Sequence, residues 1–327
     1  MGRPSPPVRS TGRGHSLELV EQARAGRVRA VARLISLVED GAPEVREITA
    51  ELCAAAGERP PPWVVGLTGA PGVGKSTSTS MLVRGFRERG LRVGVLAVDP
   101  SSPFTGGALL GDRVRMQDHA TDPEVFIRSM ASRGHLGGLA WATPQATRVL
   151  AAAGCEVILI ETVGVGQAEV DVASLADTTI VLVAPGMGDG VQAAKAGILE
   201  IADVFVVNKA DRDGAQAAIR DLRNMIALVE RPWKPPIVPT VAVRGEGADD
   251  LLDALDRHLR HLEESGELAR RRLARARDEI ESIAVTALRS RFSVHGDARL
   301  DSLAAEVVAG ATDPYTAADA LLATLPS

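Results

Sequence analysis

The sequence has little of what secreted and membrane proteins depend on. Only two of its 327 residues are cysteine, Cys53 and Cys155. They lie far apart, so a disulfide framework is not indicated and a reducing cytoplasm is the expected location. No apolar run approaches the roughly 18 residues that a membrane-spanning helix needs. The first 14 residues hold prolines and arginines but no apolar segment, which predicts a disordered tail rather than a secretory signal.

Aromatic residues and surplus positive charge are also scarce. Aromatic residues make up 3% of the chain, and the formal net charge is −5. Nothing overall favours nucleic acid or an anionic membrane as a partner, because both attract basic surfaces. We expect Trp141 and Trp233 to pack inside the protein rather than to stack on bases. The remaining composition, 45% hydrophobic and 24% charged, is ordinary for a soluble globular protein.

The stretch around which the chain is organised is GAPGVGKS at residues 69–76. It fits the phosphate-binding pattern G-x-x-x-x-G-K-[S/T] at every fixed position, with a predicted strand before it at 63–68 and a predicted helix after it at 77–89. Glycines let backbone N–H groups surround phosphate oxygens, and the helix N-terminus adds its positive dipole end. Lys75 is expected to reach the β- and γ-phosphates, and the Ser76 hydroxyl to ligate Mg²⁺. The nucleotide-binding residues predicted here are Gly69, Gly72, Val73, Gly74, Lys75, Ser76 and Thr77.

Apolar strands alternate with helices after this stretch. Strands are predicted at 92–99, 125–130, 155–161, 178–184, 203–208 and, more weakly, 236–241, with helices at 143–153, 189–201, 213–230 and 248–263. The alternation predicts an α/β fold, a P-loop domain over residues 61–265 with a mainly parallel sheet covered by helices on both faces. Residues 1–60 are predicted to form a tail and a helical extension, with helices at 16–39 and 43–56. Residues 266–327 are predicted to form helices at 267–291, 300–309 and 314–325.

A guanine-reading motif follows one of the predicted strands. Residues 208–211 read N-K-x-D, directly after DVFVVN. Guanine presents its N1–H and N2–H₂ donors side by side, and the Asp211 carboxylate can accept from both, whereas adenine has no such pair of donors. Lys209 can lay its stem on the base. Asn208, Lys209 and Asp211 are therefore predicted to bind the nucleotide, and the chain to be a GTPase.

Acidic residues end two further strands. Residues 161–164, ETVG, have the spacing of the D-x-x-G loop that senses the γ-phosphate and Mg²⁺, with Glu161 as the acid and Gly164 as a nucleotide contact. Val165 stands where many GTPases carry the glutamine that orients the attacking water, so slow intrinsic hydrolysis is expected. Asp99, at a strand end, and Asp112, in a glycine-rich run, are further candidates for the Mg²⁺ shell.

Two other groups of residues are interpreted as structural. His258 and His261 lie three residues apart on one predicted helix, but no cysteine or acid cluster completes a metal site, and we expect surface histidines. Five arginines near the start of the C-terminal segment are flanked by acidic residues, which favours a solvated or salt-bridged helix over a phosphate-backbone site. These arginines are Arg270, Arg271, Arg272, Arg275 and Arg277.

Four segments together resemble the MeaB/ArgK GTPases. They are DPSS at 99–102, GGALLGD at 106–112, ETVGVGQ at 161–167 and NKAD at 208–211. That family consists of chaperones associated with methylmalonyl-CoA mutase and belongs to the signal-recognition-particle-like class of P-loop proteins. The similarity covers about residues 16–265 well, and the C-terminal helices agree in character more than in motif.

The resemblance implies a partner and a mechanism. The GTPase would gate adenosylcobalamin loading into an acyl-CoA mutase, and protect or reactivate that enzyme. It implies GTP or GDP and Mg²⁺ as ligands, with Asp99, Asp112 and Glu161 serving the metal and the switches. A third switch at 185–195 would bring Gln192 and Lys195 to the nucleotide when the partner binds. A homodimer formed through the C-terminal helices is also implied.

The chain departs from the family pattern at two places. Gly190-Val191 replace the usual sequence of the third switch, and T-V-A at 240–242 replaces T-S-A in the loop beside guanine. Only the backbone N–H of Ala242 needs to reach the base, so GTP binding is expected to survive. The alternatives are a nickel-delivery GTPase, which normally shows a His-rich or Cys-rich segment that this sequence lacks, and a small-molecule kinase, against which N-K-x-D argues.

Overall fold

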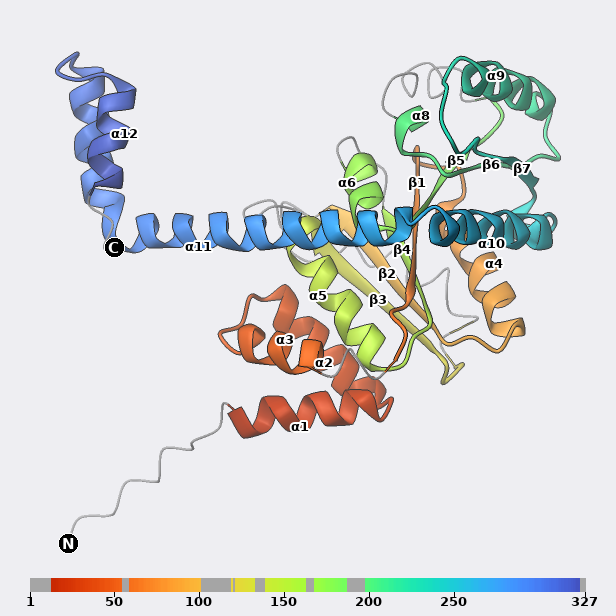
Figure 1. The fold of residues 1–327 in the computed structure, drawn as a ribbon, viewed down its shortest axis with the longest axis horizontal. Coiled ribbons are helices and arrows are strands. Elements are labelled where there is room, and N and C mark those ends of the chain that lie inside the picture. The colour runs from red at the N-terminus through yellow and green to blue at the C-terminus, as the bar shows by residue number, and fades with distance from the viewer. Residues whose placement is uncertain are drawn as a thin grey trace, which may run out of the picture. The chain divides into compact units, whose positions relative to one another are not determined.

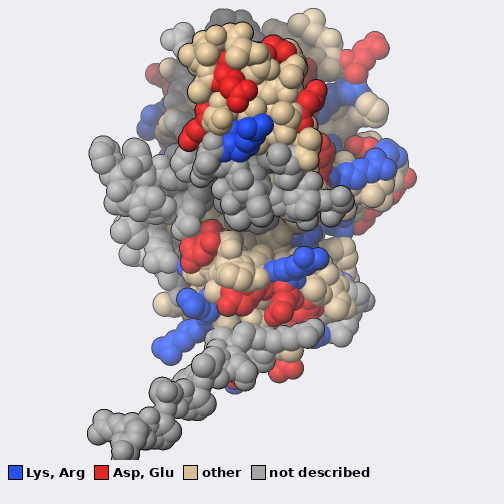
Figure 2. Space-filling view, turned by 90° about the vertical axis from the view of Figure 1, so that its left-hand side faces the viewer, with Lys and Arg blue, Asp and Glu red and all other residues tan. Residues whose placement is uncertain are grey.

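The computed structural model describes residues 13–54, 59–100, 119, 121–132, 139–162, 168–186 and 198–323. The chain forms two compact units, with the boundary between Arg275 and Ala276. Within the described ranges, no helix is long and apolar enough to cross a membrane. On the face drawn in Figure 2, acidic and basic side chains are interspersed on the described surface rather than gathered into a patch of one sign.

The first unit is built on a parallel sheet. Seven strands of the described chain lie in the order β3-β2-β4-β1-β5-β6-β7, and every neighbouring pair is parallel. The predicted α/β fold with a parallel sheet is therefore confirmed. Each strand lies within two residues of its predicted bounds, and the strands are β1 (Trp63–Gly69), β2 (Val93–Pro100), β3 (Val125–Ser132), β4 (Val157–Thr162), β5 (Thr178–Val183), β6 (Val204–Asn208) and β7 (Ile237–Thr240).

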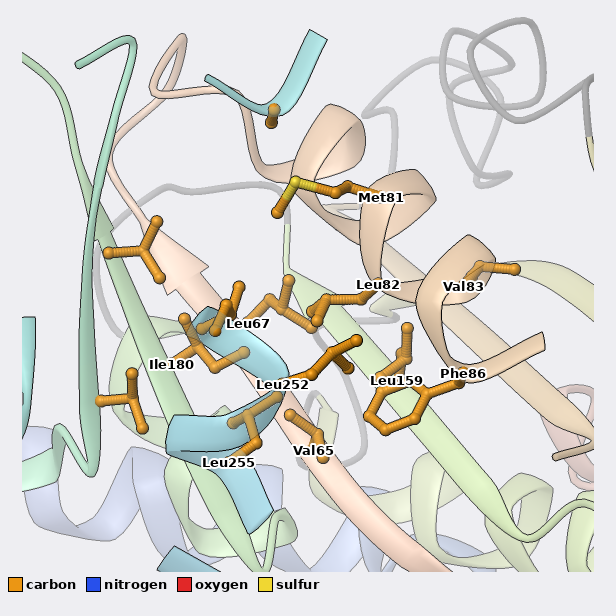
Figure 3. Close-up of a cluster of buried hydrophobic side chains, with 14 of the residues drawn as sticks. Val65, Leu67, Met81, Leu82, Val83, Phe86, Leu159, Ile180, Leu252 and Leu255 are labelled. Atoms are coloured by element: carbon orange, nitrogen blue, oxygen red, sulfur yellow. The ribbon is translucent and has the colours of Figure 1, made fainter. Parts of the chain in front are cut away.

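Helices α4 (Lys75–Glu88) and α10 (Ala248–Glu264) cover one face of this sheet. Strand side chains alternate between the two faces, so Val65 and Leu67 of β1 both point to this one. They meet Leu82 and Phe86 of α4 and Leu252 of α10 in a buried apolar cluster, which Figure 3 shows between the two helices and the strands. This packing fixes the direction in which α4 leaves the end of β1.

The opposite face is covered in two halves, as Figure 1 shows. Helices α5 (Leu139–Ala152) and α6 (Ala168–Leu175) pack on β1, β2 and β4, and α9 (Ala215–Ala227) packs on β6 and β7; α8 (Ile198–Ile201) contacts α6 and joins the apolar cluster under α9. Helices α1 (Arg13–Arg24), α2 (Val28–Glu39) and α3 (Val45–Ala54) pack against α5. Their apolar residues share one buried cluster with α5 and the strands, so the N-terminal helices extend the core of this unit.

The single helix predicted at 16–39 is wrong, because two helices occupy this stretch. Gly26 adopts a left-handed conformation with φ 74. Its N–H donates to the Ala23 carbonyl at 2.8 Å, and the Arg27 N–H donates to the Gln22 carbonyl at 3.0 Å. This pair of bonds is the Schellman motif, which ends a helix at a glycine. Apolar periodicity continued across the break because α1 and α2 bury their faces in the same core.

The break predicted between residues 291 and 300 is also wrong. Helix α11 runs without interruption over Glu267–Val308, and α12 follows at Pro314–Leu322. Gly296 lies inside α11, where a glycine costs only about 1 kcal/mol relative to alanine and does not by itself stop a helix. The Asp313 carboxylate begins α12 by accepting from the N–H groups of Tyr315 at 2.9 Å and Thr316 at 3.1 Å.

His258 is not the surface residue that its sequence context predicts. Its side chain is 0% exposed, its Nδ1 lies 2.9 Å from the Thr178 hydroxyl, and its Nε2 lies 3.2 Å from Asp203 Oδ1. Asp203, directly before β6, also accepts from the Arg271 guanidinium at 2.8 and 3.0 Å. Trp233 packs on both histidine rings and donates its indole N–H to the Asp203 carbonyl at 2.8 Å, which confirms its packing role.

A second buried carboxylate lies at the same edge of the sheet. Asp177, directly before β5, is 0% exposed and is paired with Arg272 at 2.9 Å and with Arg275. The prediction of a salt-bridged helix is therefore confirmed. The flanking Glu267 pairs with Arg270 at 2.6 Å, whereas Arg271, Arg272 and Arg275 reach Asp203 and Asp177, which are distant in the sequence. The start of α11 is tied to the amino ends of β5 and β6 by arginine pairs to Asp177 and Asp203.

Candidate functional site

The predicted phosphate loop connects the carboxyl end of β1 to the N-terminus of α4. Lys75, the first residue of α4, donates from Nζ to the carbonyls of Gly69 at 2.6 Å and Ala70 at 3.1 Å. Gly74 lies directly before the helix with φ 96, and a Cβ there would stand 2.3 Å from Asn208 Nδ2. Only glycine fits both the backbone conformation and the close approach. The N-terminus of an α-helix carries a partial positive charge from the helix dipole, which favours an anion at this end of α4.

A buried carboxylate lies beside the start of α4. Glu161, 1% exposed at the end of β4, accepts from the Ser76 hydroxyl at 2.6 Å on Oε1. Thr79 Oγ1 lies 2.8 Å from Glu161 Oε2. The structure therefore brings together Ser76 and Glu161, two of the residues predicted to serve Mg²⁺. Both are oxygen donors of the kind that Mg²⁺ prefers.

The N-K-x-D motif holds the phosphate loop from its other side. Asn208, 3% exposed at the end of β6, donates from Nδ2 to the Val73 carbonyl at 2.8 Å. Lys209 donates from Nζ to the Gly72 carbonyl at 2.6 Å and has a left-handed backbone with φ 58. A non-glycine residue in this region costs about 1–2 kcal/mol, so the conformation is one that the surrounding contacts hold in place. The two loops predicted to read base and phosphate thus form one hydrogen-bonded piece.

The loop after β7 completes this side of the site. Asn208 Oδ1 accepts from the Thr240 hydroxyl at 3.2 Å and from the Ala242 N–H at 3.1 Å. The Ala242 N–H, which we expected to reach the base, therefore donates to Asn208 in this structure. Ala242 begins the short 3₁₀ helix η4 (Ala242–Arg244). Arg244, in this helix, donates from Nη1 to Asp211 Oδ2 at 3.1 Å.

Part of the predicted site lies outside the described residues. Asp112, Gly164, Gln192 and Lys195 belong to those stretches, and for Asp99 only the backbone is described. The register places Asp99 near Glu161, because Ala97 of β2 pairs with Glu161 of β4. The other predicted site residues lie along the carboxyl ends of β1, β4, β6 and β7, where open parallel sheets bind ligands.

Sequence reasoning missed two side chains that contact the predicted site residues. Thr79 could have been found, because it lies three residues after Ser76 and so shares its face of α4. Arg244 carried no local signal, since its contact with Asp211 joins residues 33 positions apart. Its pKa is raised by hydrogen bonding to Glu246, whose own pKa is lowered by the same bond.

Comparisons with known proteins identify the family of the chain. A family model described as methylmalonyl Co-A mutase-associated GTPase MeaB matches residues 31–297. A putative GTPase of Pyrococcus abyssi is 47% identical over 93% of this chain and 95% of its own length. The mitochondrial methylmalonic aciduria type A homolog of Mus musculus is 36% identical over 81% of this chain and 66% of its own length.

One solved structure matches almost the whole chain. It is described as a LAO/AO transport system kinase, and it is 26% identical with a TM-score of 0.71 over 97% of this chain and 98% of its own. The GTPase ArgK of Escherichia coli is 35% identical over 73% of this chain and 74% of its own length. The resemblance drawn from the four sequence segments is confirmed, and the enzyme is a GTPase that binds GTP and GDP. The chain belongs to the MeaB family, the methylmalonyl-CoA mutase-associated GTPases.

Proposed function

We propose that this GTPase binds its nucleotide across the loops described above and uses GTP hydrolysis to serve an adenosylcobalamin-dependent acyl-CoA mutase. The phosphates would lie on residues 69–77 and Gly164, and guanine on Asn208, Lys209, Asp211 and Ala242. The observation that carries the base site is the pair of bonds from Asn208 and Lys209 to the phosphate-loop carbonyls. They hold the base-reading side chains at a fixed distance from the phosphate loop.

Mg²⁺ is the proposed metal, and the residues present fit it. The Ser76 hydroxyl and the buried Glu161 carboxylate lie 2.6 Å apart, and Asp99 and Asp112 would supply further oxygen ligands, directly or through water. The metal would neutralise developing negative charge on the phosphate oxygens. Lys75, whose amine now satisfies two loop carbonyls, would turn to the β- and γ-phosphates when they are present.

The partner proposal rests on the family. The family is described as methylmalonyl Co-A mutase-associated, and the mouse relative is named for methylmalonic aciduria. The GTPase would gate adenosylcobalamin loading into the mutase, and protect or reactivate it. Val165 occupies the position where many GTPases orient the attacking water, so the resting enzyme is expected to be slow. A partner that completes the site would then control the rate.

The third switch is the proposed point of control. Residues 185–195 follow β5, whose carboxyl end lies beside that of β1. When the mutase binds, Gln192 and Lys195 would join the nucleotide, and the Lys195 ammonium would stabilise the charge that develops on the transferred phosphate. We also propose that the protein is a homodimer joined through its C-terminal helices, whose apolar residues Leu273, Ile280 and Leu300 are 55%, 68% and 51% exposed.

Steady-state phosphate release tests this function. Wild type, Lys195→Ala and Lys234→Ala are each assayed with GTP and Mg²⁺, with and without candidate adenosylcobalamin-dependent acyl-CoA mutases. Lys234 is exposed and serves as the charge-matched control. We expect one mutase to accelerate hydrolysis by wild type and Lys234→Ala, and Lys195→Ala to lose the acceleration with its basal rate unchanged. Equal acceleration of all three proteins contradicts the switch role, and no acceleration or binding by any mutase contradicts the partner.

A further inference from the structure

The Asp211 carboxylate is bound to a side chain from another loop. Arg244 Nη1 donates to Asp211 Oδ2 at 3.1 Å. The same guanidinium donates from Nε to Glu246 Oε1 at 2.6 Å and from Nη2 to Glu246 Oε2 at 3.3 Å. Both carboxylate oxygens of Glu246 therefore accept hydrogen bonds from one edge of the guanidinium, and the remaining nitrogen, Nη1, donates to Asp211.

The two-point contact with Glu246 fixes the guanidinium plane. A single hydrogen bond leaves a long side chain free to rotate, whereas the paired bonds of an arginine–carboxylate fork set both its distance and its orientation. Glu246 is itself held in place, because its carbonyl accepts from the Val241 N–H at 3.0 Å and closes the loop after β7. This bond fixes the backbone that carries Glu246, and the paired bonds then direct the third nitrogen of Arg244 to Asp211.

We propose that Arg244 is a positioning residue for guanine recognition, which holds the Asp211 carboxylate in the orientation that accepts from the base. The inference rests on the proposed role of Asp211 as the guanine acceptor. Each carboxylate oxygen has two lone-pair directions, so Oδ2 can keep its bond to Arg244 and still accept a second donor. A chain of hydrogen bonds then connects the loops that follow β7 and β6. It runs from Glu246 through Arg244 to Asp211, which would contact guanine.

These contacts are expected to contribute little to the stability of the fold. The side chains of Asp211, Arg244 and Glu246 are 39%, 50% and 57% exposed, and ion pairs between exposed groups contribute little to folding. A fixed orientation of the Asp211 carboxylate should instead strengthen nucleotide binding, because a preorganised acceptor loses less conformational entropy when the base binds. Arg244 is therefore expected to change nucleotide affinity with little change in thermal stability.

If Arg244 instead competes with guanine for Asp211, a different result is expected. If guanine needed the lone pair that Arg244 occupies, the guanidinium would compete with the base and its removal would tighten binding. Two features argue against competition. The hydrogen bond from Arg244 goes to Asp211 Oδ2, and the paired bonds to Glu246 hold the guanidinium in place whether or not Asp211 is engaged.

The test is equilibrium titration of full-length protein with GDP and XDP, which need no hydrolysis and no partner. The variants are Arg244→Ala, Arg244→Lys, Glu246→Gln, Asp211→Asn and the double variant of Asp211→Asn with Arg244→Ala. Arg212→Ala is the matched control, because Arg212 is an exposed arginine of the same loop as Asp211 and its loss removes the same charge. Melting temperatures of all variants are recorded beside the affinities.

We expect Arg244→Ala to weaken GDP binding about fivefold, with smaller losses for Arg244→Lys and Glu246→Gln and none for Arg212→Ala. Asp211→Asn should lose GDP and gain XDP, and adding Arg244→Ala to it should not change XDP affinity. GDP affinity that is unchanged or tighter in Arg244→Ala overturns the positioning role while leaving Asp211 as the acceptor. Unchanged GDP affinity in Asp211→Asn overturns the base assignment itself, and the inference with it.

Discussion

Replacing Asp203 with asparagine tests the buried charge network at the amino end of β6. Asp203 Oδ2 accepts from the Thr179 N–H at 2.9 Å and from Arg271 Nη1 at 2.8 Å, and Oδ1 accepts from Arg271 Nη2 at 3.0 Å. Asparagine keeps the shape, but its amide group donates where an acceptor is needed. In either orientation of the asparagine amide, its NH₂ group faces an N–H donor of Arg271. The positive charge of Arg271 also loses the negative charge of Asp203.

The magnitude follows from the burial of the two partners. Removing one member of a buried ion pair costs about 3–5 kcal/mol, because the remaining charge is left uncompensated. Asp203 is 2% exposed, but Arg271 is 30% exposed and its Nε lies 3.5 Å from Glu267 Oε1. Water and Glu267 therefore offset part of the loss. We expect Asp203→Asn to lower the free energy of unfolding by about 3 kcal/mol, the low end of that range.

The same network predicts a dependence on pH. Burial alone raises the pKa of Asp203, but the hydrogen bonds from His258 and Arg271 outweigh it and lower the pKa from 3.8 to about 2. A carboxyl group whose folded pKa lies below its unfolded value of about 3.9 stabilises the fold above that value. The contribution, about 2–3 kcal/mol, is lost as the pH falls from about 4 through 2. The gap in stability between wild type and Asp203→Asn should therefore narrow over this interval.

Urea denaturation followed by circular dichroism measures both effects. Asp256→Asn is the control, since Asp256 bonds Arg89 at the same 2.8 Å but is 41% exposed. An exposed pair of this kind is worth about 0–1 kcal/mol. Equal losses for the two variants would refute the argument from burial. A gap between wild type and Asp203→Asn that stays constant down to pH 2 would refute the pH argument.

Three further predictions concern the site and the assembly. Gly74→Ala should weaken GDP binding at least about tenfold, because its Cβ would stand 2.3 Å from Asn208 Nδ2, whereas Gly90→Ala has a comparable φ with nothing within 4 Å and should bind normally. Glu161→Gln should raise the Mg²⁺ concentration that half-saturates hydrolysis about tenfold, and an unchanged Mg²⁺ response would remove its metal role. Sedimentation should find full-length protein as a dimer and residues 1–275 as a monomer; the cut follows Arg275 because Asp177 needs that arginine. A monomeric full-length chain would contradict the dimer.

The parts that sequence predicted well are those with local causes. Each strand is a short apolar, β-branched run, and burial on both faces of a parallel sheet requires such runs. The phosphate loop and N-K-x-D were placed correctly because each follows directly from a strand. The end of α1 at Gly26 was missed for the opposite reason: the apolar spacing continues, and only the left-handed glycine interrupts the helix.

The parts that sequence missed depend on partners distant in the chain. His258 is buried because Thr178, 80 residues away, and Asp203 lie against its ring. Arg271 belongs to a run of charges that looked solvated, yet its partner Asp203 lies 68 residues away. The local sequence does not distinguish buried His258 or half-buried Arg271 from nearby exposed residues such as Glu263 and Glu264. Only the strand order brings them together.

Strand β6 connects the buried network around Asp203 to the hydrogen bonds of Asn208, one of the residues proposed to bind guanine. Asp203 directly precedes it, and Asn208 ends it, with four fully buried residues between them. The strand is paired on both sides, to β5 and to β7, so neither end can shift without breaking a ladder. The residues proposed to bind guanine therefore lie on a fixed part of the fold, anchored through Asp203 to His258 and Arg271. If the proposed base site is correct, we expect control of hydrolysis to act through Glu161 and the proposed third switch, and substitutions at those positions to change the rate while leaving guanine affinity intact.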